Sequence, residues 1–89
     1  MIVDSKTENE PAQKTGGSIY LKAIDPAENK ARFYAMYIIN DLWGGYSLVR
    51  EYGRIGQPGR VLMNWHPKKN DATNSMNKIS RLKQKRGYQ

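Results

Sequence analysis

Three residues with side chains suited to nucleic acid recognition recur at every second position near the middle of the chain: Arg50, Tyr52 and Arg54. Residues two apart lie on one face of a β-strand, so a strand that continues through Gly53 presents an aromatic ring between two guanidinium groups. A guanidinium group binds phosphate in a bidentate manner, and an aromatic ring stacks on a base. The alternative is structural, with Tyr52 as a core aromatic residue and Arg54 as a solvated turn residue.

Regularly spaced glycines follow these side chains. Gly53, Gly56 and Gly59 recur at every third residue, and Pro58 precedes the last of them. The regularity predicts a tight hairpin end, at which glycine amides can approach a ligand closely. Arg60 follows at the start of the next predicted strand and so belongs to the same end. The spacing is not that of a dinucleotide-binding fingerprint or a P-loop, which also need a following helix.

The positive charge of the chain is concentrated in its second half. The 89 residues carry a net charge of +7. Residues 1–49 hold five Lys or Arg against six Asp or Glu, whereas residues 50–89 hold ten against two. Such a distribution is typical of a polyanion-binding protein, and a solubilising surface is the alternative. Lys83 and Arg86 are placed to add phosphate contacts if the end of their helix borders the site.

The composition lacks the residues of a catalytic or metal centre. Cysteine is absent and His66 is the single histidine. The sequence therefore offers no zinc finger and no thiol nucleophile, and one histidine gives little basis for a metal site or a catalytic triad. We therefore expect no enzymatic activity, no cofactor and no metal. No apolar run approaches the roughly 20 residues of a membrane span, and the N-terminus lacks the apolar core of a signal peptide. The expected location is the cytoplasm, without a membrane partner.

One domain can be built from the rest of the chain. Residues 1–17 are polar and end in a glycine pair, which predicts a disordered tail before a domain over residues 18–89. Four segments have the periodicity and composition of strands, namely residues 18–24, 30–40, 46–52 and 60–66. The second is apolar on both faces, which indicates a central position in the sheet. In the fourth, Val61, Met63 and Trp65 share an apolar face, and we expect Trp65 to lie in the core.

The C-terminal segment has the periodicity of a helix. We expect it over residues 71–86, with Asn70 or Asp71 as the N-cap. Gly87 is the expected C′ residue, after which Tyr88 folds back over the last turn. One face is apolar and is formed by Ala72, Met76, Ile79 and Leu82. The sequence thus predicts an α+β fold: an antiparallel β-sheet of about four strands with one C-terminal α-helix packed on it.

Several motifs, in their order, resemble the WGR domain family, which is named for a Trp-Gly-Arg motif followed by a hydrophobic residue and Gly. The matching segment is Tyr52-Gly53-Arg54-Ile55-Gly56, preceded by Trp43-Gly44-Gly45-Tyr46. Further matches are Asp25-Pro26, Asn29-Lys30, Phe33-Tyr34 and Lys85-Arg86-Gly87-Tyr88. The resemblance covers about residues 18–88, and its one conspicuous departure is Tyr52 in place of the signature Trp.

WGR domains occur in poly(ADP-ribose) polymerases and in bacterial proteins, and this chain is similar to a stand-alone member. The resemblance implies non-enzymatic binding of nucleic acid, with DNA favoured and DNA ends or breaks included. It implies that Tyr52 stacks on a terminal sugar or base and that Arg54 pairs with the nucleic acid. The alternative is a protein–protein interaction module that docks an acidic partner. We expect a monomer, and the predicted contact residues are Arg50, Tyr52, Gly53, Arg54, Arg60, Lys83 and Arg86.

Overall fold

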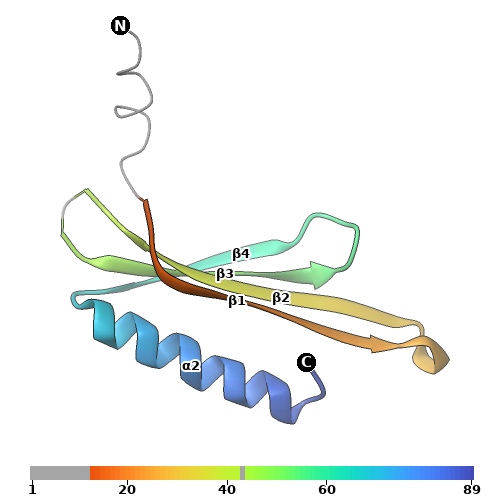
Figure 1. The fold of residues 1–89 in the computed structure, drawn as a ribbon. Helices are drawn as coiled ribbons and strands as arrows, with labels where there is room; N and C mark the ends of the chain where they lie inside the picture. The colour runs from red at the N-terminus through yellow and green to blue at the C-terminus, as the bar shows by residue number, and fades with distance from the viewer. Residues whose placement is uncertain (1–12, 43) are drawn as a thin grey trace, which may run out of the picture.

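A four-stranded antiparallel sheet carries one helix on one of its faces in the computed structural model, which describes residues 13–42 and 44–89 (Figure 1). The strands follow one another in sequence order across the sheet. Their bounds are β1 (Gln13–Asp25), β2 (Lys30–Asn40), β3 (Tyr46–Arg54) and β4 (Arg60–His66). A 3-10 turn, η1 (Pro26–Glu28), joins β1 to β2, and α2 (Lys69–Lys85) follows β4. The predicted α+β architecture is confirmed.

β1 is longer than the sequence predicts. It begins at Gln13, which pairs with Asn40, and its register shifts between Thr15 and Ser18. The polar residues 13–17, which the sequence assigns to a tail, therefore lie in a strand. The backbone groups of residues 13–15 pair with the far end of β2, a contribution that their side chains do not reveal. The remainder of the expected tail, residues 1–12, lies outside the described residues.

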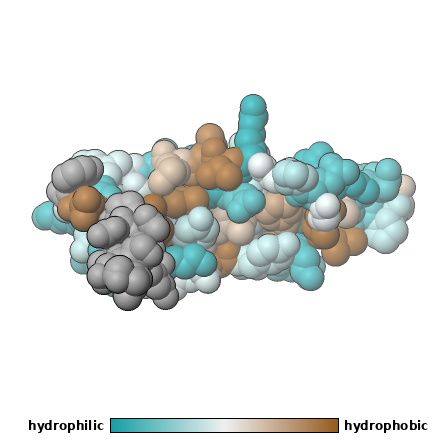
Figure 2. All heavy atoms as spheres, turned by 90° about the horizontal axis from the view of Figure 1, so that it is seen from above, coloured by the Kyte–Doolittle hydropathy of each residue, from teal (hydrophilic) through white to brown (hydrophobic). Residues whose placement is uncertain are grey.

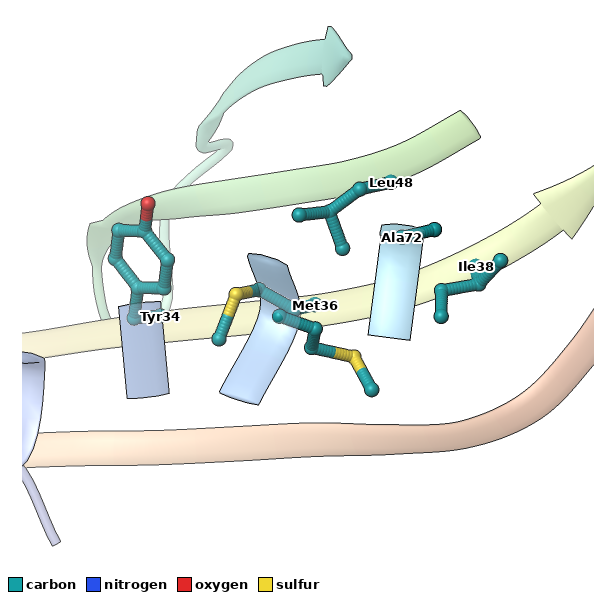
Figure 3. Packing of buried hydrophobic residues seen from close by; sticks show 6 residues of the cluster. Tyr34, Met36, Ile38, Leu48 and Ala72 are labelled. Atoms are coloured by element: carbon teal, nitrogen blue, oxygen red, sulfur yellow. The ribbon is translucent and has the colours of Figure 1, made fainter. Parts of the chain in front are cut away.

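The core lies between the sheet and α2. Its buried members are Tyr34, Met36 and Ile38 from β2, Leu48 from β3, and Ala72 and Met76 from α2. Figure 3 shows the labelled β2 side chains beside Leu48 and Ala72. Alternate residues of β2 point toward the helix because the side chains of a strand change face at every residue. The central position of β2 is confirmed, since β1 and β3 flank it.

The buried stripe of α2 differs from the predicted one at its C-terminal end. Ala72, Met76 and Ser80 are buried as expected for one helical face, but Leu82 is 48% exposed. At 3.6 residues per turn, the stripe that starts at Ala72 and Met76 reaches position 83 rather than 82. It therefore carries Lys83 toward the sheet. Among the described residues, no helix is long and apolar enough to cross a membrane.

The two ends of α2 are formed differently. The N-cap is Lys68, which makes no side-chain capping bond, so the prediction of Asn70 or Asp71 as the cap is wrong. Asp71 instead lies in the first turn, where its charge complements the helix dipole. The C-terminal end has the predicted glycine, because Gly87 adopts a φ of 101°.

A Schellman motif ends α2 and directs the chain back to the sheet. The backbone N–H of Gly87 donates to the carbonyl oxygen of Gln84, and that of Tyr88 donates to the carbonyl oxygen of Lys83, both at 3.1 Å. Gln89 and Lys22 then exchange backbone hydrogen bonds of 2.8 and 2.9 Å. Tyr88 is thereby held between the helix end and β1, as the sequence predicts for a residue that folds back over the last turn.

The apolar face of β4 points away from the helix. Val61, Met63 and Trp65 are 54–58% exposed, so the expectation that Trp65 lies in the core is wrong. The alternation along β4 was predicted, but α2 covers the opposite face of the sheet. Periodicity shows which residues share a face, whereas the position of the helix decides which face is buried.

Candidate nucleic-acid interface

β3 continues through Gly53 to Arg54, so Arg50, Tyr52 and Arg54 share one face as predicted. This face is the one that α2 covers, because Leu48 has the same parity and belongs to the core. Toward the β3–β4 hairpin the sheet extends past the C-terminal end of α2 (Figure 1). The register places Tyr34 of β2 opposite Tyr52.

The β3–β4 hairpin has the tight end that its glycines predict. The N–H of Gln57 donates to the carbonyl oxygen of Arg54 at 3.1 Å, within a turn where Gly56 has a φ of +89°. Gly59 lies so close to its neighbours that an added Cβ would be 2.8 Å from the Phe33 ring and from the Tyr52 carbonyl oxygen. Glycine is therefore needed at both positions, at one for conformation and at the other for space.

An open cavity of about 460 Å³ lies where the end of α2 meets this part of the sheet. We call it the tyrosine cavity. Four of the seven predicted contact residues line it, namely Tyr52, Gly53, Arg54 and Lys83. Three further residues complete the lining: Arg32, Tyr34 and Tyr88. Strand, hairpin and helix end thus contribute to one concave surface.

Three tyrosine rings form the aromatic part of the cavity. The Tyr34 and Tyr52 rings are stacked, with centroids 5.2 Å apart and planes inclined by 12°. The Tyr88 ring meets Tyr34 edge-on, at 6.2 Å and 80°. Tyr52 is half-buried and packs against the core while also lining the cavity. Both readings of Tyr52 from the sequence, core aromatic and surface ring, therefore hold in part.

Lys83 lies over two of these rings. Its Nζ is 4.6 Å from the Tyr34 centroid and 5.6 Å from the Tyr88 centroid, within cation–π range. Burial lowers the pKa of Lys83, and the positive charges of Arg86, Arg50 and Arg32 lower it further. Among the residues that the structure describes, the charged groups that lower the pKa of Lys83 are all arginines. An anion in the cavity would relieve this repulsion.

Two of the arginines on the β3 face are held by hydrogen bonds. Arg54 is exposed, and its Nη1 and Nη2 donate to the backbone and side-chain oxygens of Asn29 at 3.2 and 3.3 Å. Asn29 ends η1 in a left-handed conformation, with a φ of 53°. Arg50 donates to the Tyr34 hydroxyl at 3.2 Å and to Asn64 Oδ1 at 3.1 Å. The guanidinium groups therefore have fixed positions before any ligand binds.

The remaining predicted residues lie near the cavity without lining it. Arg60 is exposed and pairs with Tyr52 across the β3–β4 ladder. Arg86 is the C-cap of α2 and acts on Lys83 through its charge. The sequence did not assign a site role to Arg32, although it lies two residues before Tyr34 on β2 and pairs with Arg54. Pairing the predicted strands 30–40 and 46–52 in antiparallel register would have pointed to it.

A family model for the WGR domain matches residues 17–89. This chain belongs to the WGR domain family. The chain is also similar to the uncharacterized protein y4dW of Sinorhizobium fredii, with 39% identity over 70 residues. That alignment covers 79% of this chain and 34% of the relative, so the chain spans about a third of the relative's length.

Membership of the family is consistent with a role in nucleic acid binding, since the WGR domain is a module of this kind in poly(ADP-ribose) polymerases. It also suggests a non-catalytic module. Within residues 13–42 and 44–89, no group of three or more His, Cys, Asp or Glu residues could hold a metal ion.

Proposed function

We propose that this WGR domain binds DNA through the tyrosine cavity and that it prefers DNA ends. One observation carries the proposal: Lys83 lies over the Tyr34 ring, which stacks with Tyr52, and within the described part of the chain the charges that lower the Lys83 pKa belong to three arginines. Phosphates would bind to Lys83 and to the arginines of the cavity. A base or sugar would pack against the tyrosine rings, which contributes about 1–3 kcal/mol per base in other proteins.

The preference for ends follows from the shape of the site. Bases inside a duplex are already stacked on both sides, so a ring within a cavity can reach a base only where the strand ends or is unpaired. Tyr52 is half-buried against the core and stacks on Tyr34, so its ring is placed to meet an accessible base rather than to insert between two stacked ones. The hairpin end and the end of α2 flank the ring and would face the backbone on either side.

The test is fluorescence anisotropy with a labelled duplex and with the same duplex closed by hairpin caps. We expect tighter binding to the open duplex. Arg54→Ala and Lys83→Ala each remove one charge-assisted contact, so we expect affinity to fall about 10-fold for each. Tyr52→Leu keeps an apolar side chain but loses the aromatic ring, and we expect it to weaken the preference for open ends.

Lys78→Ala is the matched control because Lys78 lies exposed on α2 and does not line the cavity. It should bind within about twofold of the parent. Thermal unfolding of each variant separates lost contacts from lost structure. If the Arg54, Lys83 and Tyr52 variants all bind like the parent at moderate salt, the tyrosine cavity is not the site.

A second candidate function rests on the same positively charged side chains, Lys83 and the arginines of the cavity. Carboxylates of an acidic protein partner could occupy the positions proposed for phosphates. Fluorescence anisotropy with labelled duplex DNA, with single-stranded DNA and with heparin separates the two functions. Equal binding of all three would reveal generic charge attraction, and binding of none would favour the protein partner.

A further inference from the structure

The outer face of β4 is an exposed apolar strip in an otherwise basic chain. Val61, Met63 and Trp65 project from it on the side without a helix and are 54, 57 and 58% exposed. Figure 2 looks onto this side of the sheet, where apolar surface gathers in patches between hydrophilic ones. Side chains of this size rarely stay in water as a contiguous row without a binding role.

β4 is also an open edge of the sheet. Among the strands that the structure describes, it lies last in the order, next to β3 alone. Its register with β3 is unbroken from Tyr46–His66 to Tyr52–Arg60, so no bulge twists the edge away. Its sequence, RVLMNWH, contains neither lysine nor proline. A bulge, a lysine or a proline commonly protects the edge strand of a monomeric protein from pairing with another chain, and β4 has none of the three.

Trp65 is held in position before any partner binds. Its Nε1 donates to Asp41 Oδ2 at 3.1 Å. Its ring lies against Gly45, where an added Cβ would collide with the indole. Glycine at position 45 thus provides the space that the ring occupies. A large aromatic side chain that is exposed yet fixed loses little conformational freedom on binding, as is typical of residues that dominate interfaces.

The charge distribution indicates the kind of partner. On β3 and β4, the arginines of the candidate site have even numbers and project toward the helix side, whereas Trp65 and its neighbours project to the other side. Glu51 is the single charged residue of these two strands on the open side. A nucleic acid or an acidic protein would gain little from this near-neutral surface. A neutral apolar strand would fit it.

We propose that the partner is a second copy of this chain, joined through antiparallel β4–β4 pairing centred on Met63. In this register Met63 lies opposite itself and Val61 lies opposite Trp65, so the apolar strip continues across the two-fold axis. Arg60 lies opposite His66 rather than opposite another arginine. The strand is thus self-complementary. The proposal departs from the monomer expected from the sequence, and the exposure of Val61, Met63 and Trp65 supports it.

Sedimentation analysis of the full chain at about 100 µM tests the proposal, since strand-edge interfaces lie at the small, weak end of the size range. We expect a dimer for the parent. Met63→Lys places two like charges opposite each other across the axis and should yield a monomer. The matched control is Ile24→Lys, because Ile24 is 59% exposed on β1 at the other edge and should leave the dimer intact.

A mixing experiment tests the register itself. Met63→Glu alone should also be monomeric, whereas an equimolar mixture of Met63→Lys and Met63→Glu should associate, because the axis then joins opposite charges. Circular dichroism checks that each variant is folded. A parent that stays monomeric overturns the proposal, as does a dimer that survives Met63→Lys. A mixture that fails to associate overturns the Met63-centred register. These readouts involve no nucleic acid, so they are independent of the proposed function.

Discussion

Lys83 shows how one residue links the fold to the candidate site. It follows the buried stripe of α2, where an apolar side chain would pack, yet it carries an amine to the face of Tyr34. Burial and three arginines lower its pKa, so its charged form is less favoured in the free domain than that of an ordinary lysine. A charge that is disfavoured at a position where packing would favour an apolar side chain is typical of a functional residue.

The lowered pKa of Lys83 predicts how the proposed DNA binding depends on pH. The Lys83 ammonium is charged below its pKa, so its contribution to phosphate binding is present at neutral pH and lost as pH rises through that value. Because the pKa is lowered from 10.5, this loss begins at lower pH than for an ordinary lysine. We therefore expect affinity to fall as pH rises through this lowered pKa, at lower pH than the ordinary pKa of a lysine side chain would give. Fluorescence anisotropy titrations at constant ionic strength measure the affinity at each pH.

The Lys83→Arg variant tests the assignment, because a guanidinium group stays charged as pH rises through the lysine pKa. It should bind DNA with a flatter pH profile than the parent. Lys78→Arg makes the same change on the exposed side of α2 and should reproduce the parent's profile. A Lys83→Arg profile as steep as the parent's would show that another group causes the loss.

At the scale of elements, the positions of strands and turns could be predicted and their contacts only in part. Residues 30–40 are predicted as a strand by their aromatic and aliphatic composition, residues 60–66 by period-two alternation, and the end of α2 by Gly87. The tight β3–β4 turn follows from its glycines. The face that α2 covers could not be predicted, because alternation is symmetric with respect to the two faces. This is why alternation alone leads to the incorrect expectation that Trp65 lies in the core.

The candidate site shows the same limit. Tyr52 and Arg54 could be predicted because one strand presents both. Arg32 and Asn29 reach the site through the register of β2 with β3 and through η1, which depend on pairing between segments. The extension of β1 to Gln13 could not be predicted for a similar reason. It depends on backbone pairing with β2 and not on the composition of the added residues themselves.

The helix register can be tested by two substitutions on α2. Met76 is 4% exposed in the core, so Met76→Ala should lower the free energy of unfolding by about 2–5 kcal/mol. Leu82 is 48% exposed, so Leu82→Ala should change it by less than about 0.5 kcal/mol. Urea denaturation followed by circular dichroism measures both. Equal losses for the two variants would favour the stripe predicted from the sequence, with Leu82 in the core.

For the whole molecule, strand parity separates two surfaces with different properties. On β3, the even-numbered side chains contribute Leu48 to the core and, farther along the strand, Arg50 and Arg54 to the candidate site. Side chains of the other parity on β4 form the apolar strip. A sheet with a helix on one face can thus combine a basic site with a neutral edge, and a second copy on that edge would leave both tyrosine cavities open.

This separation predicts that salt dependence follows the position of a charge rather than the net charge of the chain. Each phosphate contact contributes about −0.9 to the slope of log K against log salt concentration. We expect Arg54→Ala and Lys83→Ala each to make the slope shallower by about that amount. Met63→Lys raises the net charge by one, but its new ammonium lies on the face away from the cavity, so the slope should stay unchanged. Anisotropy titrations over a salt series measure all three variants, and a steeper slope for Met63→Lys would show that DNA also reaches the open face of the sheet.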